Sequence, residues 1–249
     1  MKRISTLVPF LALIFLGACK EKDPTSTPQA RGGSMQLNIS ETVNGKSLVF
    51  NDFQYMTEAG DTFQVTLLQY YLSNFSFHSP ETGWKQVSHY QLVRADEAST
   101  STFTIKDLPF GNYDSIRFYM GIDSVTNHDI SKEGNLDPGY GMIWTWNSGY
   151  IFYMFEGKFV DSLNRVIPFA YHIGGDDYLM TYEMALPTSK TLSSSQTLAN
   201  IDLTLELDEI FKTPTRIELN HVAKVSHTFD EPALTTQLKD NLLDAYTVK

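Results

Sequence analysis

Polar and hydrophobic residues alternate along most of the chain from Met35 onward. In the segment Gln36-Leu37-Asn38-Ile39, the side chains of Leu37 and Ile39 fall on one face and the polar side chains on the other. A period of two residues is typical of a β-strand with one buried face. The same pattern predicts strands at residues 63–67, 70–77, 103–105, 115–120, 151–159, 166–173, 178–184 and 199–207.

Turn-forming residues separate these segments. Asn44-Gly45, Pro109-Phe110-Gly111-Asn112 and Gly174-Gly175-Asp176-Asp177 are examples, and such residues favour tight turns. Eight or more short strands at this spacing predict an all-β domain. We therefore expect an antiparallel β-sandwich, immunoglobulin-like or jelly-roll-like, over residues 35–249.

A helix is predicted near the C-terminus. Asp230 can cap it and Pro232 suits its first turn. Leu234, Leu238 and Leu242 then form an apolar stripe. We expect this stripe to pack on the sandwich, the alternative being a helix that binds a partner. A second helical turn is expected at residues 207–211.

The N-terminus has the three parts of a secretory signal peptide. A basic start, Met1-Lys2-Arg3, precedes an apolar run and the small residues of Leu16-Gly17-Ala18-Cys19, and the run is too short for a stable membrane helix. The last four residues resemble the lipobox of bacterial lipoproteins, which implies cleavage after residue 18 and acylation of Cys19. The alternative is an ordinary signal peptide with an incidental cysteine.

The lipobox resemblance implies a protein anchored by lipid to the outer membrane, on its periplasmic or cell-surface side. Residues 19–34 read as a flexible tether rich in Pro, Ser, Thr and Gly. The short charged segment Lys20-Glu21-Lys22-Asp23 resembles the export tag of surface-displayed lipoproteins. Loss of Lys2 and Arg3 leaves 17 basic against 29 acidic residues, a net charge of −12.

The composition excludes several classes of function. An acidic chain has no clustered Lys and Arg for nucleic-acid phosphates. One cysteine forms neither an internal disulfide nor a thiolate metal cluster. The sequence contains no phosphate-binding loop, nucleophile elbow or zinc-protease motif. Nothing in the sequence argues for catalysis, and we expect a binding protein and not an enzyme.

The candidate binding residues are concentrated in three segments between residues 121 and 175. They are Gly121-Ile122-Asp123-Ser124 through Asn127-His128, the run Met142-Ile143-Trp144-Thr145-Trp146-Asn147-Ser148-Gly149-Tyr150, and Phe169-Ala170-Tyr171-His172-Ile173-Gly174. These three segments resemble the MbnP-like proteins, a family first named for periplasmic copper-binding proteins encoded beside the copper-chelating peptide methanobactin.

The resemblance implies a β-sandwich that binds copper(I) through histidines and a kynurenine made from tryptophan. It further implies a partner, a di-haem peroxidase similar to MauG, that oxidises the tryptophan. The matching ligands are His128 and His172, and the oxidised residue is Trp144 or Trp146. Imidazole is a suitable copper ligand. His227 is a candidate third ligand, the alternative being a packing or solvent-facing histidine.

Two features complicate this assignment. Better-known relatives have several cysteines in the mature domain, whereas this chain has none after Cys19. If residues 151–159 and 166–173 form a hairpin, His172 lies opposite about residue 153, and Trp146 is roughly 23 Å away at ~3.3 Å per residue. A metal site therefore requires the chain to bend near Asn147-Ser148-Gly149.

A second functional hypothesis needs no metal. Trp144, Trp146 and Tyr150 share one face of an extended chain. As an exposed row they would form a stacking platform for a glycan or a peptide, and as a buried row they would be core. The positions of the imidazoles relative to the indoles discriminate between metal site and platform.

Overall fold

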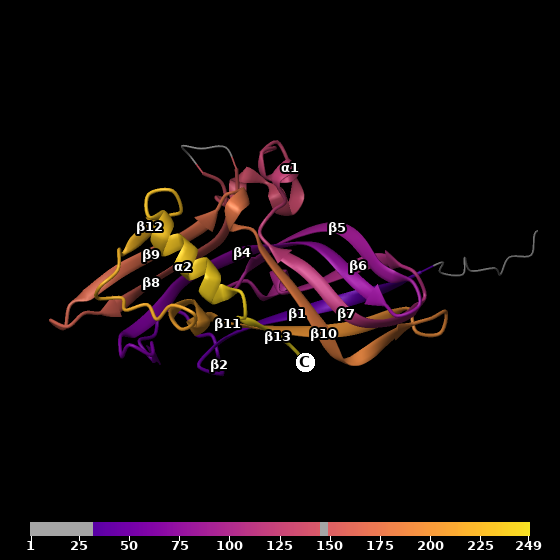
Figure 1. Cartoon of the computed structure of the whole chain (residues 1–249), viewed down its shortest axis with the longest axis horizontal. Coiled ribbons are helices and arrows are strands. Elements are labelled where there is room, and N and C mark those ends of the chain that lie inside the picture. The colour runs from indigo at the N-terminus through magenta and orange to yellow at the C-terminus, as the bar shows by residue number, and fades with distance from the viewer. Residues whose placement is uncertain (1–31, 145–148) are drawn as a thin grey trace, which may run out of the picture.

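A computed structural model of the chain describes residues 32–144 and 149–249, which form two β-sheets packed together as a sandwich (Figure 1). The predicted lipid attachment point, Cys19, and one of the two candidate tryptophans, Trp146, lie outside the described residues.

The smaller sheet has five strands within the described residues, in the order β13-β11-β1-β2, with β6 also paired to β1. In the central strand β1, Met35, Leu37 and Ile39 are buried, which confirms the alternation predicted there. The strands are β1 (Gly33–Val43), β2 (Lys46–Ser47), β6 (Thr102–Leu108), β11 (Leu198–Glu206) and β13 (Tyr246–Val248).

The larger sheet has eight strands in the same part of the chain, in the order β10-β7-β4-β8-β9-β12, with β3 and β5 also paired to β4. The long strand β4 pairs with β8 along its first half and with β7 along its second. The strands are β3 (Tyr55–Met56), β4 (Thr62–Ser79), β5 (Gly83–Arg94), β7 (Gly111–Met120), β8 (Ile151–Val160), β9 (Val166–Gly174), β10 (Met180–Leu192) and β12 (Val225–His227).

Both sheets are mixed, so the expected purely antiparallel sandwich is wrong in two places. Strand β1 runs parallel to β11, and β9 runs parallel to β12. Turn signals identify hairpins between consecutive strands, which are antiparallel, whereas a parallel pair needs a longer connection that leaves no local signal. Asn38, for example, pairs with Asp202, 164 residues further along the chain.

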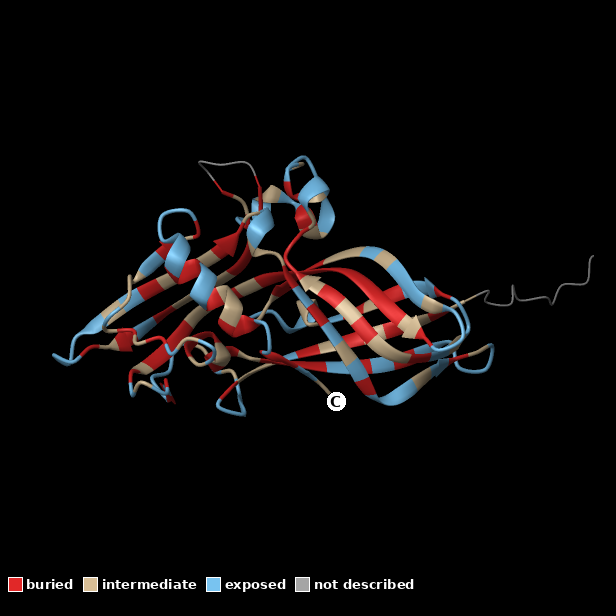
Figure 2. Ribbon diagram, viewed as in Figure 1, coloured by how far each residue is buried: buried red, intermediate tan, exposed pale blue. Residues whose placement is uncertain are grey.

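Aromatic side chains fill the space between the sheets. Phe118 stacks on Phe75 at 5.8 Å and on Tyr182 at 5.3 Å between ring centroids. Figure 2 shows buried positions alternating with exposed ones along many of the strands. The high aromatic content of the sequence is thus largely explained by the core, since each ring buries a large apolar area.

A second, smaller hydrophobic cluster lies apart from this core. It includes Tyr71 of β4, Leu136, Met142, Trp144 and Tyr150. Tyr70, the neighbour of Tyr71, belongs instead to the core between the sheets, because successive residues of a strand point to opposite faces. The second cluster holds the connection between β7 and β8 against the larger sheet. This packing fixes Trp144 on the side of that sheet that faces away from the main core.

The predicted C-terminal helix is present, and its stripe packs inward. In α2 (Pro232–Leu242), Leu234, Leu238 and Leu242 are buried, and Pro232 occupies the first turn. The cap is Glu231 and not Asp230 as expected, because the Asp230 carboxylate bonds to His227. The remaining helical segments are α1 (Ser124–Asn127), η1 (Ala98–Thr100), η2 (Gly134–Leu136), η3 (Pro138–Tyr140), η4 (Asp176–Tyr178) and the expected η5 (Leu207–Phe211).

Among residues 32–144 and 149–249, no helix has both the length and the apolar character needed to cross a bilayer.

Candidate metal centre

Two of the predicted histidines lie side by side on the larger sheet. His172 of β9 and His227 of β12 are directly paired in the parallel register, and their ring centroids are 5.2 Å apart. The neighbours Tyr171 and Ile173 point into the core, so His172 points away from it. Strand pairing therefore brings together two imidazoles that are 55 residues apart in the sequence.

The hairpin that carries His172 agrees closely with the prediction. His172 pairs with Met154, where the sequence predicted about residue 153. The turn lies between Val160 and Val166, as expected. The pairing of Val160 with Val166 centres the turn on Leu163, and this register continues to His172, which gives the offset of one residue.

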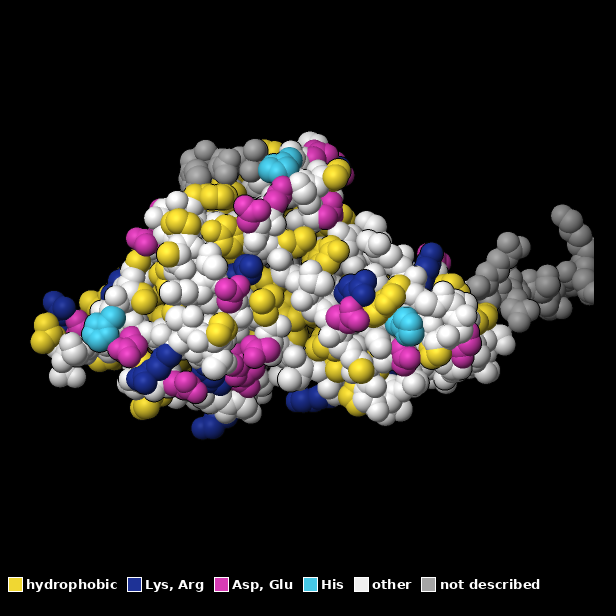
Figure 3. Space-filling model, viewed as in Figure 1, with side chains coloured by type: hydrophobic (Ala, Val, Ile, Leu, Met, Phe, Trp, Pro, Cys, Tyr) yellow, Lys and Arg dark blue, Asp and Glu magenta, His cyan; other side chains and the backbone are white. Residues whose placement is uncertain are grey.

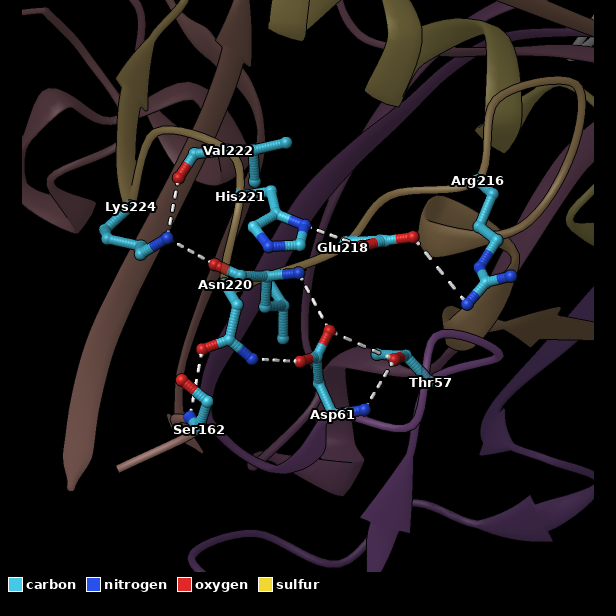
Figure 4. A network of polar contacts seen from close by, with 10 residues as sticks. Thr57, Asp61, Ser162, Arg216, Glu218, Asn220, His221, Val222 and Lys224 are labelled. Carbon is cyan, nitrogen blue, oxygen red and sulfur yellow. Dashed lines mark hydrogen bonds and ion pairs between the residues drawn. The ribbon is translucent and has the colours of Figure 1, made fainter. Parts of the chain in front are cut away.

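A polar network fixes the segment that leads into β12 (Figure 4). The buried Asp61 carboxylate accepts hydrogen bonds from the Leu219 amide at 2.8 Å and from Asn220 Nδ2 at 2.5 Å. Lys224 Nζ donates to the carbonyls of Leu219 and Val222. Because buried charge-assisted bonds hold the segment, β12 and His227 have a defined position.

Thr228 fastens the strand end beside the two histidines. Its buried hydroxyl donates to the His172 carbonyl at 2.7 Å and accepts from the Gly174 amide at 2.9 Å. These two bonds continue the contact between β12 and β9 past the last paired residue. They hold the backbone of His172 in register with His227.

Trp144 lies against the same end of β9. A Cβ atom on Gly174 would come within 3.0 Å of Trp144 Cζ2 and 2.6 Å of the Tyr150 carbonyl oxygen, so only glycine leaves room for the indole here. The Trp144 ring also lies 6.2 Å from that of Phe229, two residues after His227. One indole is thus next to the strand positions that carry the histidines.

The bend that the sequence required is present. Ile143 pairs with Tyr150 in antiparallel fashion, and the Trp144 amide donates to the Gly149 carbonyl at 3.1 Å. The segments that end at Trp144 and begin at Gly149 therefore run antiparallel, while Asn147 and Ser148, where the bend was also expected, lie outside the described residues. Gly149 has φ +128°, a conformation that favours glycine.

His128 and Trp144 line one pocket, which has a volume of about 240 Å³. His128 follows the short helix α1, and its Nε2 lies 3.1 Å from Asp176 Oδ2. Figure 3 shows acidic side chains close to hydrophobic ones at the α1 end of the molecule. Asn127, Asp176, Asp177 and Phe229 also line the pocket, together with Gly175 and Tyr178.

Each of the three histidines has a carboxylate on one ring nitrogen. Nε2 of His172 is 2.9 Å from Glu156 and Nδ1 of His227 is 3.1 Å from Asp230, which parallels the contact between His128 and Asp176. Such carboxylates typically fix the tautomer and orientation of a metal-binding imidazole. The second ring nitrogen of each histidine has no hydrogen-bond partner within the described part of the chain.

The protonation states suit metal binding. Burial lowers the pKa of His172, against the opposing effect of Glu156, so the imidazole is neutral at neutral pH. Neutral imidazole is the form that binds metals. A hydrogen bond from Ser124, with others from Asn127 and His128, lowers the pKa of Asp176, which is therefore ionised.

The structure does not unite all three histidines in one cluster. Within residues 32–144 and 149–249 there is no group of three or more His, Cys, Asp and Glu side chains placed to hold a metal ion. His172 and His227 form one pair, and His128 lies in the pocket with Trp144. A site with two imidazoles and one altered aromatic fits copper(I), which accepts few ligands, better than a metal that needs a cage of oxygens.

Several residues around these histidines were missed from the sequence. Asp176 was assigned only to a turn, although it follows His172 by four residues. Asn127 was noted only as the neighbour of His128. Glu156 and Thr228 have no local signal, because pairing between strands alone brings them to His172.

The aromatic platform of the second hypothesis is not formed by its described members. Trp144 is 6% exposed and Tyr150 is fully buried, with the Tyr150 hydroxyl bonded to the Leu136 carbonyl at 2.9 Å. A stacking platform requires exposed ring faces. These two rings instead belong to the second hydrophobic cluster.

Comparisons with known proteins identify the family and a similar fold. A family model described as MbnP matches residues 32–228. The solved structure of MbnP from Methylosinus trichosporium is similar, with a TM-score of 0.56 and 12% sequence identity, over 87% of this chain and 98% of that one. No curated protein matches the chain. Because the family model covers most of its length, the chain belongs to the MbnP family.

Proposed function

We propose that the protein is an extracytoplasmic, lipid-anchored protein that binds copper(I), and that it is not an enzyme. The observation that carries this proposal is the pairing of His172 with His227, with ring centroids 5.2 Å apart on the outer face of the larger sheet. Two neighbouring imidazoles, each oriented by a carboxylate, are a suitable donor set for copper(I).

The histidine pair and the pocket that contains His128 are connected through β9. Gly174 touches Trp144, and Asp176, two residues further on, contacts His128. This continuity supports His128, His172 and His227 as candidate ligands. Copper would supply a redox-active cation, and the protein residues hold and orient it.

The proposal includes oxidation of Trp144 or Trp146 to kynurenine by a di-haem peroxidase similar to MauG. The change is a four-electron oxidation for which peroxide would be the oxidant. The indole ring opens and its C2 carbon leaves as formate, so the residue exchanges one carbon for one oxygen and carries an aryl amine and a ketone, both of which can approach a metal. The place of Trp144 beside Gly174 and in the pocket with His128 supports an aromatic ligand in this region.

Mass spectrometry and copper titration test the proposal. In protein from its native source, or co-produced with the partner peroxidase, the peptide containing Trp144 and Trp146 should show the exchange of one carbon for one oxygen. Competition against a chromogenic copper(I) chelator should then show tighter binding by the modified form. His221→Ala is a matched control, because His221 is exposed and its side chain bonds to no described residue other than Glu218.

Two results together would refute the proposal. One is an unmodified peptide in natively produced protein. The other is copper affinity no better than that of the double variant His128→Ala and His172→Ala.

The lipid anchor is tested separately. Cys19→Ser should release the protein from the outer-membrane fraction into the soluble extracytoplasmic fraction, because stable attachment needs the acyl chains. Ser26→Ala, in the expected tether, serves as the control. Retention of the Cys19→Ser protein in the membrane would contradict the proposed anchor.

A further inference from the structure

Asp176, in the turn after β9, is bonded to three side chains from the α1 region. Its Oδ1 accepts from Asn127 Nδ2 at 2.8 Å, and its Oδ2 accepts from Ser124 Oγ and lies 3.1 Å from His128 Nε2. We propose that Asp176 is the positioning residue of the copper site: it holds His128 as the Nε2–H tautomer and thereby presents Nδ1 to the metal. This inference rests on the proposed function.

The chemistry of the bonds fixes the tautomer. A carboxylate only accepts hydrogen bonds, so the proton between His128 and Asp176 belongs to Nε2 of the imidazole. In a neutral imidazole the other nitrogen, Nδ1, then carries a lone pair. His128 side-chain exposure is 54%, so packing alone does not orient the ring, and the bond to Asp176 is its directional contact.

Asn127 extends this arrangement to the tryptophan segment. While its amide nitrogen donates to Asp176, its Oδ1 accepts from the Tyr150 amide at 2.8 Å. A Cβ on Gly149 would lie 3.0 Å from the same oxygen. Asp176 therefore connects three parts of the site, namely the end of β9, the His128 loop and the return of the chain after residue 148.

Asp177 provides a matched control. It lines the same pocket and has the same charge, but no hydrogen bond or ion pair connects it to another described residue. Asp177→Asn removes one negative charge from the pocket and leaves the contacts of His128 intact. Asp176→Asn removes the same charge and also places an amide nitrogen among groups that donate hydrogen bonds.

The first measurement needs no metal. Nitrogen-15 correlation spectra of the histidine rings should show His128 as the Nε2–H tautomer in the metal-free wild type and in Asp177→Asn. In Asp176→Asn the His128 signal should shift to a mixture of tautomers, with His172 unchanged. Unaltered His128 tautomers in Asp176→Asn would overturn the positioning role.

The second measurement is copper(I) affinity by competition with a chromogenic chelator. Asp176→Asn should weaken binding by about tenfold, the usual scale for loss of a partner of a metal-bound histidine, and Asp177→Asn should stay within about twofold of wild type. Equal losses in the two variants, or no loss in either, would overturn the inference. If the wild type binds no copper, the proposed function fails, while the metal-free spectra still decide whether Asp176 orients His128.

Discussion

His172 and His227 face each other across the parallel pair β9 and β12, with ring centroids 5.2 Å apart and an angle of 68° between the ring planes. If one copper ion uses both imidazoles, the energetic effects of losing them are coupled. We predict that His172→Ala and His227→Ala each weaken copper(I) binding at least about tenfold. The fold-loss of affinity in the double variant should be smaller than the product of the two single fold-losses. Chelator competition on all four proteins measures this coupling.

The control for this cycle is His221→Ala, in the same C-terminal segment but paired with Glu218. It should bind copper as the wild type does. Strictly multiplicative losses in the double variant would show that the two histidines act at separate sites.

Thr228 should contribute more to stability than an ordinary threonine. Thr228→Val keeps the shape of the side chain but leaves the buried Gly174 amide and the His172 carbonyl without their partner. An unsatisfied buried polar group costs about 1–3 kcal/mol. Urea unfolding should show a loss of this size, whereas Thr236→Val, an exposed position on α2, should be nearly neutral. Equal stability of the two variants would contradict the role of Thr228.

Alanine substitutions at two glycines of the β8 and β9 hairpin distinguish an effect on the candidate metal site from an effect on folding stability alone. Gly174→Ala would push the new Cβ against Trp144 Cζ2, at 3.0 Å, and Gly157→Ala would push it against the Gln64 carbonyl, at 2.3 Å. We expect both variants to be destabilised. Only Gly174→Ala should shift the indole N–H resonance of Trp144 and weaken copper binding. A similar indole shift in Gly157→Ala would contradict this division.

A carboxyl at the other side of the sandwich should give the fold a dependence on pH. Burial and the nearby Asp208 raise the pKa of Glu206 from 4.5 to about 6. Between these values the folded chain binds more protons at Glu206 than the unfolded chain, so the free energy of unfolding falls as the pH rises through the interval. Well above about pH 6 the Glu206 carboxylate is ionised in the folded chain, and the free energy of unfolding is lowered by the full cost of that buried charge.

Glu206→Gln removes this charge. The variant should be more stable than wild type at pH 7, similar at pH 4, and flatter in its dependence between them, as measured by urea unfolding across pH. Glu58→Gln, at an exposed turn, should follow the wild-type profile. Parallel profiles for wild type and Glu206→Gln would show that the shifted pKa makes no contribution.

Local pattern was sufficient for much of the fold. Alternation identified β1 through Met35, Leu37 and Ile39, because one face of the strand is buried and the other is not. It failed for β5, whose first half is not buried on either face at the edge of the sheet, and for the three-residue strands β12 and β13. A short or polar strand buries too little apolar surface to show a period.

The candidate site likewise has features that local sequence predicts and contacts that it does not. Local sequence was enough to predict a mostly β sandwich, a hairpin that sets His172 within one residue of its observed partner Met154, and a bend that includes Gly149, because neighbouring residues and turn chemistry specify these features. The pairing of His227 with His172 and the contact of Asp176 with His128 became visible only in the folded chain. Both contacts arise from pairing and packing between distant segments, which depend on how the whole core is buried and therefore have no signature in any short stretch of sequence.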